Sequence, residues 1–235
     1  QVQEIIEDNK IILSFNINEG EKILVERINI LGNNITNEDV IRSELLLDEG
    51  DPFTNLNLEK SIANIKSRNI FKTVEQSISD GSSNDLKIID IRVSEKPTGE
   101  ISAGAGLGTN GGSLAFNVRE NNWLGQGKRV GLDFELSTTS LKGEISYTNP
   151  NYDLLGNSLT YNLSNVTNDK PDQGYKNSLI TTGVSTTFEQ YKNIYASLGI
   201  NASYDDLSTT SSASKALKKQ SGEYSELSGV YGFRY

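Results

Sequence analysis

The sequence predicts an α+β domain with the element order β-α-α-β-β, followed by the N-terminal part of an antiparallel transmembrane β-barrel with about eight strands. Up to residue 96, segments with strand-like alternation surround two segments whose apolar residues recur at helical spacing. From residue 100 onward, one segment after another alternates between apolar and polar residues, as the strands of a membrane barrel do. The chain-breaking cluster Pro97-Thr98-Gly99 separates the two patterns.

The composition excludes several classes of function. The chain has 235 residues and a net charge of −9, which argues against nucleic-acid binding because phosphate recognition needs a basic surface. It has no cysteine and no histidine, which excludes thiol catalysis, disulfides, histidine-based acid–base chemistry and zinc sites. We therefore expect no enzymatic activity, no catalytic residues, no metal site and no cofactor. No apolar run approaches the ~20 residues of a membrane helix, whereas a barrel strand needs only ~9–11.

Residues 1–20 are expected to hold the C-terminal strand of a preceding domain. Residues 11–17 alternate between apolar and polar side chains, and no companion strand is expected upstream of them. The tripeptide Lys10-Ile11-Ile12 recurs as Lys87-Ile88-Ile89, 77 positions later, which suggests tandem copies of one domain. Because the sequence contains no methionine, we expect residue 1 to result from processing or to lie inside a longer chain.

The next domain, residues 21–96, is expected to begin with a strand at 23–30 and a helix that starts at Thr36. Thr36 can accept a hydrogen bond from the backbone N–H of Asp39, whose side chain can reach back, in a variant of the capping box. The helix is expected to end near Gly50. Its apolar residues recur at helical spacing: Val40, Ile41, Leu45 and Leu46.

A second helix is expected to follow, capped by Thr54 or Asn55. One apolar stripe runs along it, formed by Leu58, Ile62 and Ile65. Two further strands complete the domain, at 72–78 and 86–94.

Residues 97–235 are expected to form the N-terminal half of a truncated barrel. The clearest strand is 194–204, in which every second residue is apolar or aromatic. The sequence ends at Tyr235 within a strand-like run, which we interpret as truncation. Three tight turns and two longer polar loops are expected, at 110–112, 138–141 and 189–192, and near 166–176 and 206–222.

Four motifs invite a functional interpretation. The segment from Gly106 to Gly111 fits the dinucleotide pattern GxGxxG, but a strand-like segment follows it where that pattern requires a helix, so a hairpin turn is favoured. The lysines of 215–219 are interpreted as a solvated loop and Asp205-Asp206 as surface charge. The segment 123–127 (WLGQG) fits either a plain turn with an interfacial tryptophan or a specific packing element near the barrel base.

Several short motifs, in order along the chain, resemble the BamA family of outer-membrane protein assembly factors. Residues 24–95 resemble the last polypeptide-transport-associated (POTRA) domain of that family, through ILGNN, GDPF and SRNIFKTV. The linker and first barrel strand of the family are resembled by VSEKPTGEISAGAGLGTNGG. The passage from its second to its third strand is resembled by RENNWLGQGKRVGL, and its next periplasmic turn by SYTNPNYDLLGNSL.

The resemblance implies a role in folding other barrel proteins and inserting them into the bacterial outer membrane, with the POTRA portion in the periplasm. The expected partners are unfolded outer-membrane protein clients, accessory assembly lipoproteins and membrane lipid, and no nucleic acid. In this family the first barrel strand pairs poorly with the last, and its edge receives a client strand. By position, that edge consists of Glu100, Ile101, Ser102, Ala103, Gly104, Ala105, Gly106, Leu107, Gly108 and Thr109.

A second edge is implied in the POTRA domain, where the family offers a sheet edge to clients. By position it consists of Lys72, Thr73, Val74, Glu75, Gln76, Ser77 and Ile78. An unpaired sheet edge is a template for β-augmentation, and the alternating glycines of the first barrel strand lower the cost of remodelling it. Two alternatives stay open: a related pore that exports or assembles a partner protein, and a porin-type barrel with a periplasmic module.

Overall fold

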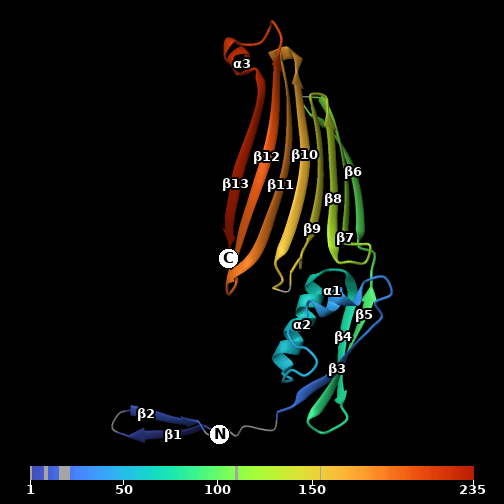
Figure 1. The fold of residues 1–235 in the computed structure, drawn as a ribbon, viewed down its shortest axis with the longest axis vertical. Coiled ribbons are helices and arrows are strands. Elements are labelled where there is room, and N and C mark those ends of the chain that lie inside the picture. Colours follow the sequence, from blue (N-terminus) through green and yellow to red (C-terminus); the bar gives the residue numbers. More distant parts are fainter. Residues whose placement is uncertain (1, 8–9, 16–21, 109–110, 154) are drawn as a thin grey trace.

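The computed structural model describes residues 2–7, 10–15, 22–108, 111–153 and 155–235, arranged around three separate sheets (Figure 1). The sheets have two, three and eight strands. The three-stranded sheet carries two helices, and the eight-stranded sheet follows it along the chain. The predicted fold class, an α+β domain followed by an antiparallel sheet of barrel type, is confirmed. Among the described residues, no helix combines the length and apolar character needed to cross a membrane.

The two-stranded sheet corrects one prediction. Strand β2 (Lys10–Phe15) pairs antiparallel with β1 (Val2–Glu7), so the expected strand does have a companion upstream. Strand β1 was not predicted from the sequence because two adjacent polar residues, Gln3 and Glu4, interrupt the apolar alternation. Residues 16 and 17 of the predicted strand lie outside the described residues. The origin of this segment in a preceding domain stays a prediction.

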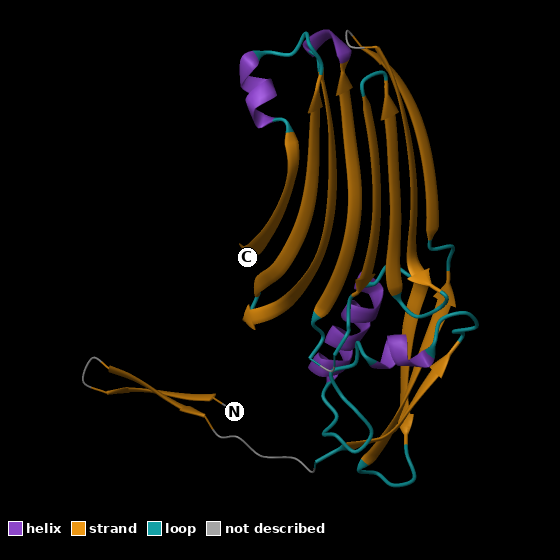
Figure 2. Cartoon of the chain, turned by 45° about the horizontal axis from the view of Figure 1, so that its top comes forward, coloured by secondary structure: helices purple, strands orange, loops and turns teal. Residues whose placement is uncertain are grey.

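The α+β domain consists of β3 (Leu24–Leu31), α1 (Glu38–Arg42), α2 (Asn55–Ser67), β4 (Phe71–Asp80) and β5 (Leu86–Glu95). The sheet order is β3-β5-β4, with β3 parallel and β4 antiparallel to β5. The helices cover one face of the sheet, and the predicted stripe Leu58, Ile62 and Ile65 is buried there. Figure 2 shows this layer of helices beneath the eight-stranded sheet.

Helix α1 is shorter than predicted and begins differently. Its N-cap is Asn37, without a side-chain cap, and Thr36 does not form the expected capping box. The helix ends at Arg42, so Leu45 and Leu46 follow it. The helix does not continue because the backbone beyond it bonds to a residue distant in the sequence. The backbone N–H of Leu46 donates to Ser61 Oγ (2.8 Å) on α2. The cap of α2 is Thr54, which accepts from the backbone N–H of Asn57.

The eight-stranded sheet is a meander in which each strand pairs with its neighbour along the chain. Strands β6 and β13 form its two edges. In order, the strands are β6 (Gly99–Gly108), β7 (Gly111–Trp123), β8 (Lys128–Ser137), β9 (Ser140–Asn149), β10 (Ser158–Lys170), β11 (Tyr175–Tyr191), β12 (Ile194–Thr209) and β13 (Gly222–Arg234).

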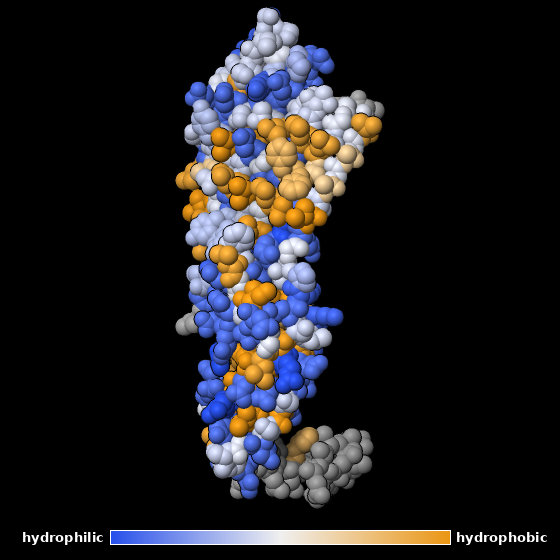
Figure 3. Space-filling model, turned by 90° about the vertical axis from the view of Figure 1, so that its right-hand side faces the viewer, coloured by the Kyte–Doolittle hydropathy of each residue, from blue (hydrophilic) through white to orange (hydrophobic). Residues whose placement is uncertain are grey.

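Strand register separates an apolar from a polar face. The row that begins at Ile101 is mostly apolar, and the row that begins at the next residue, Ser102, is polar throughout. Across the sheet the first row is Ile101, Val118, Leu132, Ile145, Leu163, Thr182, Ala202 and Leu227. The second row is Ser102, Asn117, Asp133, Glu144, Ser164, Thr181, Ser203 and Glu226. Figure 3 shows apolar side chains gathered in a band across the upper part of the molecule.

The connections between the strands lie alternately at the two ends of the sheet. At the end near the α+β domain lie the segments 124–127, 150–157 and 192–193. The predicted loop at 166–176 is mostly strand, because β10 runs to Lys170 and only the short helix η1 (Pro171–Gln173) and Gly174 precede β11. The predicted loop at 206–222 begins later, after Thr209, and contains helix α3 (Lys215–Gln220).

Candidate functional site at the first strand and the domain junction

Strand β6 presents an open sheet edge. It pairs with β7 from Gly99, opposite Glu120, to Gly108, opposite Gly111. In the described part of the chain no strand pairs with its other side. All ten residues of β6 are exposed. The predicted first-strand edge therefore lies at an unpaired edge from Glu100 to Gly108, while Thr109 lies outside the described residues.

The three glycines of β6 leave its polar face bare. Gly104, Gly106 and Gly108 share this face with Ser102, while Ile101 and its alternating neighbours lie on the apolar face. A Cβ at Gly104 or Gly108 would meet no atom within 4 Å, and one at Gly106 would meet only Ser113 Oγ, at 3.1 Å. The described neighbours thus do not require glycine here. The glycines instead leave a flat strip of backbone that another chain can approach closely.

Strand β4 forms the open edge of the three-stranded sheet. Among the described residues it pairs only with β5, and the predicted augmentation edge is exposed apart from Val74. The opposite edge, on β3, is occupied by the segment before α2. The backbone N–H of Val25 donates to Asp51 O (2.9 Å), and its carbonyl accepts from Gly50 N–H (2.7 Å). The N–H of Ile28 donates to Glu49 Oε1 (3.0 Å), which leaves β4 as the edge open to a partner.

The junction between the two domains is centred on Asn122, at the end of β7. Its Nδ2 donates to Thr36 Oγ1 (2.9 Å), and its Oδ1 accepts from the backbone N–H of Gly127 (2.7 Å). Both Asn122 and Thr36 are buried. Beside them, the backbone N–H of Asn37 donates to the carbonyl of Gly125 (2.8 Å). Thr36 thus serves the contact between domains, which explains why it does not cap α1.

Two glycines make this close contact possible. Gly125 and Gly127 have φ angles of +72° and +64°, which favour glycine. A Cβ at Gly125 would lie 2.1 Å from the carbonyl oxygen of Ile35, and one at Gly127 would lie 2.7 Å from Val40 Cγ1. The segment 123–127 is therefore a specific packing element, and the plain-turn interpretation of it is wrong.

Arg68 joins the α+β domain to two connections of the large sheet. Its Nη2 donates to the carbonyl of Gly127 (2.6 Å), and its Nε lies 3.5 Å from Glu44 Oε1. The same carboxylate oxygen accepts from Asn151 Nδ2 (2.8 Å), in the connection between β9 and β10. Burial lowers the pKa of Arg68, Glu44 opposes this shift, and Arg129 adds to it. Arginine nevertheless stays charged at neutral pH, so this is a largely buried ion pair.

Glu95 holds the loop that docks on Gly125. Its carboxylate accepts from the backbone N–H groups of Asn34 (3.1 Å), Ile35 (3.1 Å) and Thr36 (2.7 Å). Partial burial would raise the pKa of this carboxyl, but the hydrogen bonds from the loop outweigh it and lower the pKa. On the linker side, Thr98 Oγ1 donates to Glu120, and the N–H of Asn121 donates to Thr98 O (3.3 Å).

The sequence analysis missed the residues of this junction. Asn122, Arg68 and Asn151 lie in the motifs RENNWLGQG, SRN and SYTNPNYD. These motifs were noticed only as resemblances. Their partners are 59 to 107 positions away along the chain, so spacing could not reveal them.

Both parts of the chain match known families. Residues 23–96 match the family described as surface antigen variable number repeat (POTRA), and residues 122–235 match the Omp85 superfamily domain. The outer membrane protein assembly factor BamA of Neisseria meningitidis serogroup B is 29% identical over 189 residues. These residues cover 80% of this chain and 22% of that protein, so the chain spans about a fifth of this relative.

Two solved structures share the fold. BamA from Haemophilus ducreyi lacking POTRA domains 1–3 matches with a TM-score of 0.73 and 22% identity, covering 100% of this chain and 48% of that one. CdiB from Escherichia coli matches with a TM-score of 0.58 and 12% identity, covering 99% and 46%. At these identities the two structures are evidence for the fold alone.

Proposed function

Because the chain belongs to the Omp85 superfamily, with a BamA-like combination of a POTRA domain and barrel strands, we propose that it helps to assemble β-barrel proteins by templating a client strand on β6. The barrel strands lie in the outer membrane and the POTRA domain lies in the periplasm. The apolar face of the eight-stranded sheet is then its lipid-facing surface, and the polar face lines the interior of the barrel.

The place of β6 as the first strand of the sheet, with glycine at 104, 106 and 108 on its polar face, is the observation that carries the proposal. In the described residues β6 pairs on one side only, as the other edge strand β13 also does. Unpaired backbone groups within a bilayer cost several kcal/mol each, so a strand that pairs with them is strongly stabilised. Backbone pairing does not depend on side-chain identity, which suits a protein that receives many different clients.

The bare inner face of β6 supports the same role. With glycine at 104, 106 and 108, the part of this face beyond Ser102 has no side chain that hinders an incoming strand. Glycine also weakens the packing of a strand, which lowers the cost of separating β6 from whichever strand closes the barrel. We propose that this exchange of strand partners proceeds without covalent catalysis.

The POTRA domain supplies a second pairing edge. We propose that β4 holds unfolded clients by β-augmentation before they reach β6, because it is the open edge of its sheet. We further propose that accessory assembly lipoproteins bind the POTRA domain, as the family resemblance implies. Both interactions are periplasmic.

Cysteine cross-linking tests strand templating, and these 235 residues contribute no native cysteine to the background. In the complete protein, Ser102→Cys on β6 is expected to form a disulfide with a cysteine in the last strand of a stalled client. The matched control is Ser164→Cys, in the same polar row but on β10, which is paired on both sides. Trapping at 102 and not at 164 is the expected result.

The same experiment separates the alternatives. An export pore would be cross-linked by its cargo at positions inside the barrel, and a porin-type barrel by no client at all. Equal trapping at 102 and 164, or none at 102 while a client accumulates, would rule out templating on β6.

A further inference from the structure

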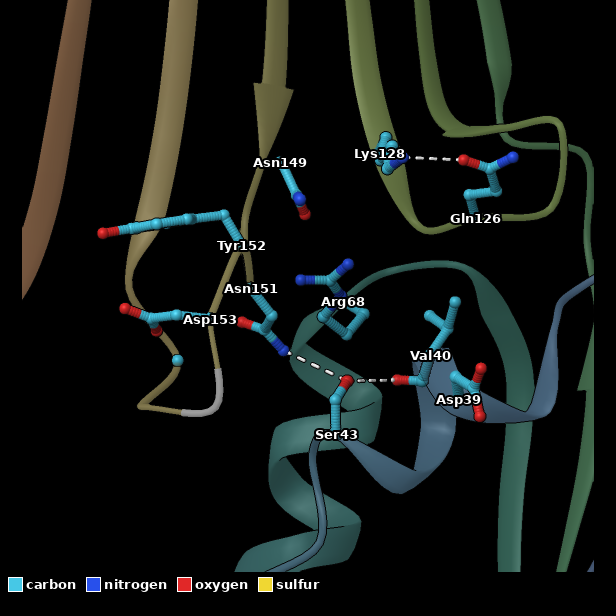
Figure 4. Close-up of a pocket in the computed structure, with 11 residues that line it drawn as sticks. Asp39, Val40, Ser43, Arg68, Gln126, Lys128, Asn149, Asn151, Tyr152 and Asp153 are labelled. Carbon is cyan, nitrogen blue, oxygen red and sulfur yellow. Dashed lines mark hydrogen bonds between the residues drawn. The ribbon is translucent and has the colours of Figure 1, made fainter.

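A cavity of about 400 Å³ lies between the base of the eight-stranded sheet and the helices of the POTRA domain (Figure 4). The sheet contributes residues from β8, from the end of β9 and from the connections at 124–127 and 150–157. The POTRA domain contributes α1 and Arg68, which follows α2. This volume lies within the range of small-ligand sites, about 300–1,000 Å³.

Strand register shows on which side of the sheet the cavity lies. Lys128 lies two residues from Val130, and Asn149 lies two residues from Tyr147, so each pair shares one face of its strand. Val130 and Tyr147 are directly paired and belong to the apolar face. Lys128 and Asn149 therefore continue the lipid-facing rows beyond their last large apolar residues, toward the periplasm. If the apolar face is lipid-facing, as proposed above, the cavity lies at the level of the headgroups of the periplasmic leaflet.

The cavity carries charges of both signs. The guanidinium of Arg68 points into it in Figure 4, held by the carbonyl of Gly127 and by its ion pair with Glu44. The ammonium of Lys128, which donates to Gln126 Oε1 (2.8 Å), lies on the same wall as Gln126. Asp39 and Asp153 add two carboxylates on the other borders.

Asp153 is held in its ionised form. Burial would raise the pKa of this carboxyl, but hydrogen bonds from Asn157 and from the backbone N–H of Leu155 outweigh that effect and lower it. A second anionic group beside it would be repelled. With Arg68 and Lys128 on one side and Asp39 and Asp153 on the others, the lining favours a ligand with both an anionic and a cationic group.

We propose that this cavity binds the headgroup of a phosphoethanolamine lipid of the periplasmic leaflet. The phosphate fits Arg68 and Lys128, since both cations form charge-assisted hydrogen bonds with phosphate oxygens. The ammonium fits Asp153 or Asp39, whose negative charges would repel an anionic lipid without an amine. A bound headgroup contacts both domains, so lipid binding favours the docked arrangement of POTRA domain and barrel.

Native mass spectrometry of the complete protein, released from bilayers of equal phosphatidylethanolamine and phosphatidylglycerol, tests this site. The protein is expected to retain phosphatidylethanolamine preferentially. Lys128→Gln is expected to weaken retention about tenfold, equivalent to about 1.4 kcal/mol. The matched control Lys192→Gln removes the same charge at the same end of the sheet, in the 192–193 connection, and is expected to retain lipid as the parent does.

Two further measurements identify the charged groups that the cavity recognises in its ligand. Asp153→Asn keeps the size of the side chain and is expected to reduce the preference for phosphatidylethanolamine over phosphatidylglycerol. Soluble phosphoethanolamine is expected to displace the lipid, whereas displacement by inorganic phosphate at the same concentration would overturn the assignment of a zwitterionic headgroup. Equal retention of both lipids by the parent, or unchanged retention in Lys128→Gln with circular dichroism confirming the fold, would overturn the site. The proposal depends on the membrane placement of the strands and not on client templating, so the two experiments can fail separately.

Discussion

At the scale of single residues, Asn122 is central to the contact that fixes the POTRA domain against the eight-stranded sheet. It is buried, and its amide makes one hydrogen bond as donor and one as acceptor, to Thr36 and to Gly127. Both partners belong to buried residues, so the Gly127 N–H has no water to replace Asn122 as its acceptor. Asparagine suits the position because it is both donor and acceptor, which neither aspartate nor leucine of similar size can be.

Asn122→Ala is expected to loosen the docking of the POTRA domain. It leaves the Gly127 N–H buried without its acceptor and removes the donor to the Thr36 hydroxyl, and a buried group left without a partner costs about 1–3 kcal/mol. The expected result is faster proteolysis at the linker 96–98, with the thermal unfolding of the barrel unchanged. Asn117→Ala, on the polar face of the same strand, removes an amide away from the junction and serves as control. Equal protection of both variants would contradict this role of Asn122.

At the scale of secondary-structure elements, the two edges of the three-stranded sheet differ, because β4 is open and β3 is closed. Strand β3 is closed by the segment 49–51, whose oxygens accept from β3 N–H groups and whose Gly50 N–H donates to the carbonyl of Val25. Arg42 adds a hydrogen bond from Nη2 to the carbonyl of Ile28 (3.1 Å). Proteins usually block exposed edges because they promote aggregation, so an edge left open where its counterpart is blocked indicates a pairing surface.

The difference between the two POTRA edges can be measured with clients. In the complete protein, Gln76→Cys on β4 is expected to cross-link to a cysteine-bearing unfolded client. Arg27→Cys, at an exposed position on β3, is the matched control and is expected to stay unmodified because the edge of β3 is covered. Cross-linking of both positions at equal rates would show that the client reacts with any exposed cysteine and does not pair with β4 as a strand.

The elements also show how far a sequence can be interpreted. Alternation predicted the strands of the large sheet, and helical spacing predicted the stripe of Leu58, Ile62 and Ile65, because both patterns are local. The capping box at Thr36 was wrong because a residue 86 positions away competes for the same hydroxyl. The two interpretations of 123–127 could not be separated, since Ile35 and Val40, the residues that require glycine there, are also distant in sequence.

At the scale of the whole molecule, the junction determines how the periplasmic edge of β4 is presented relative to the membrane edge of β6. One loop, residues 32–36, connects the two systems. On one side Glu95 accepts three of its backbone N–H groups, and on the other side Thr36 contacts Asn122. The charge of Glu95 therefore supports the docked arrangement even though its carboxylate does not contact the barrel strands.

This arrangement predicts that docking weakens in acid. The folded-state pKa of Glu95 is lowered from its ordinary value of 4.5, so its stabilisation is complete above that value and is lost as the pH falls through the lowered pKa. Spin labels at Lys66→Cys and Asp172→Cys, both exposed, report the distance between the domains. The distance distribution is expected to be narrow at neutral pH and to broaden as the pH falls below about 4.5.

Two variants assign the titration to one group. Glu95→Gln has no charge to lose, so its distribution is expected to be broader at neutral pH and to change little in acid. Asp80→Asn removes another carboxyl with a lowered pKa, which is paired with Lys87 away from the junction, and is expected to keep the parent's response. If Glu95→Gln stayed as narrow as the parent at neutral pH and broadened in the same acid range, docking would depend on other carboxylates and the role given to Glu95 would be wrong.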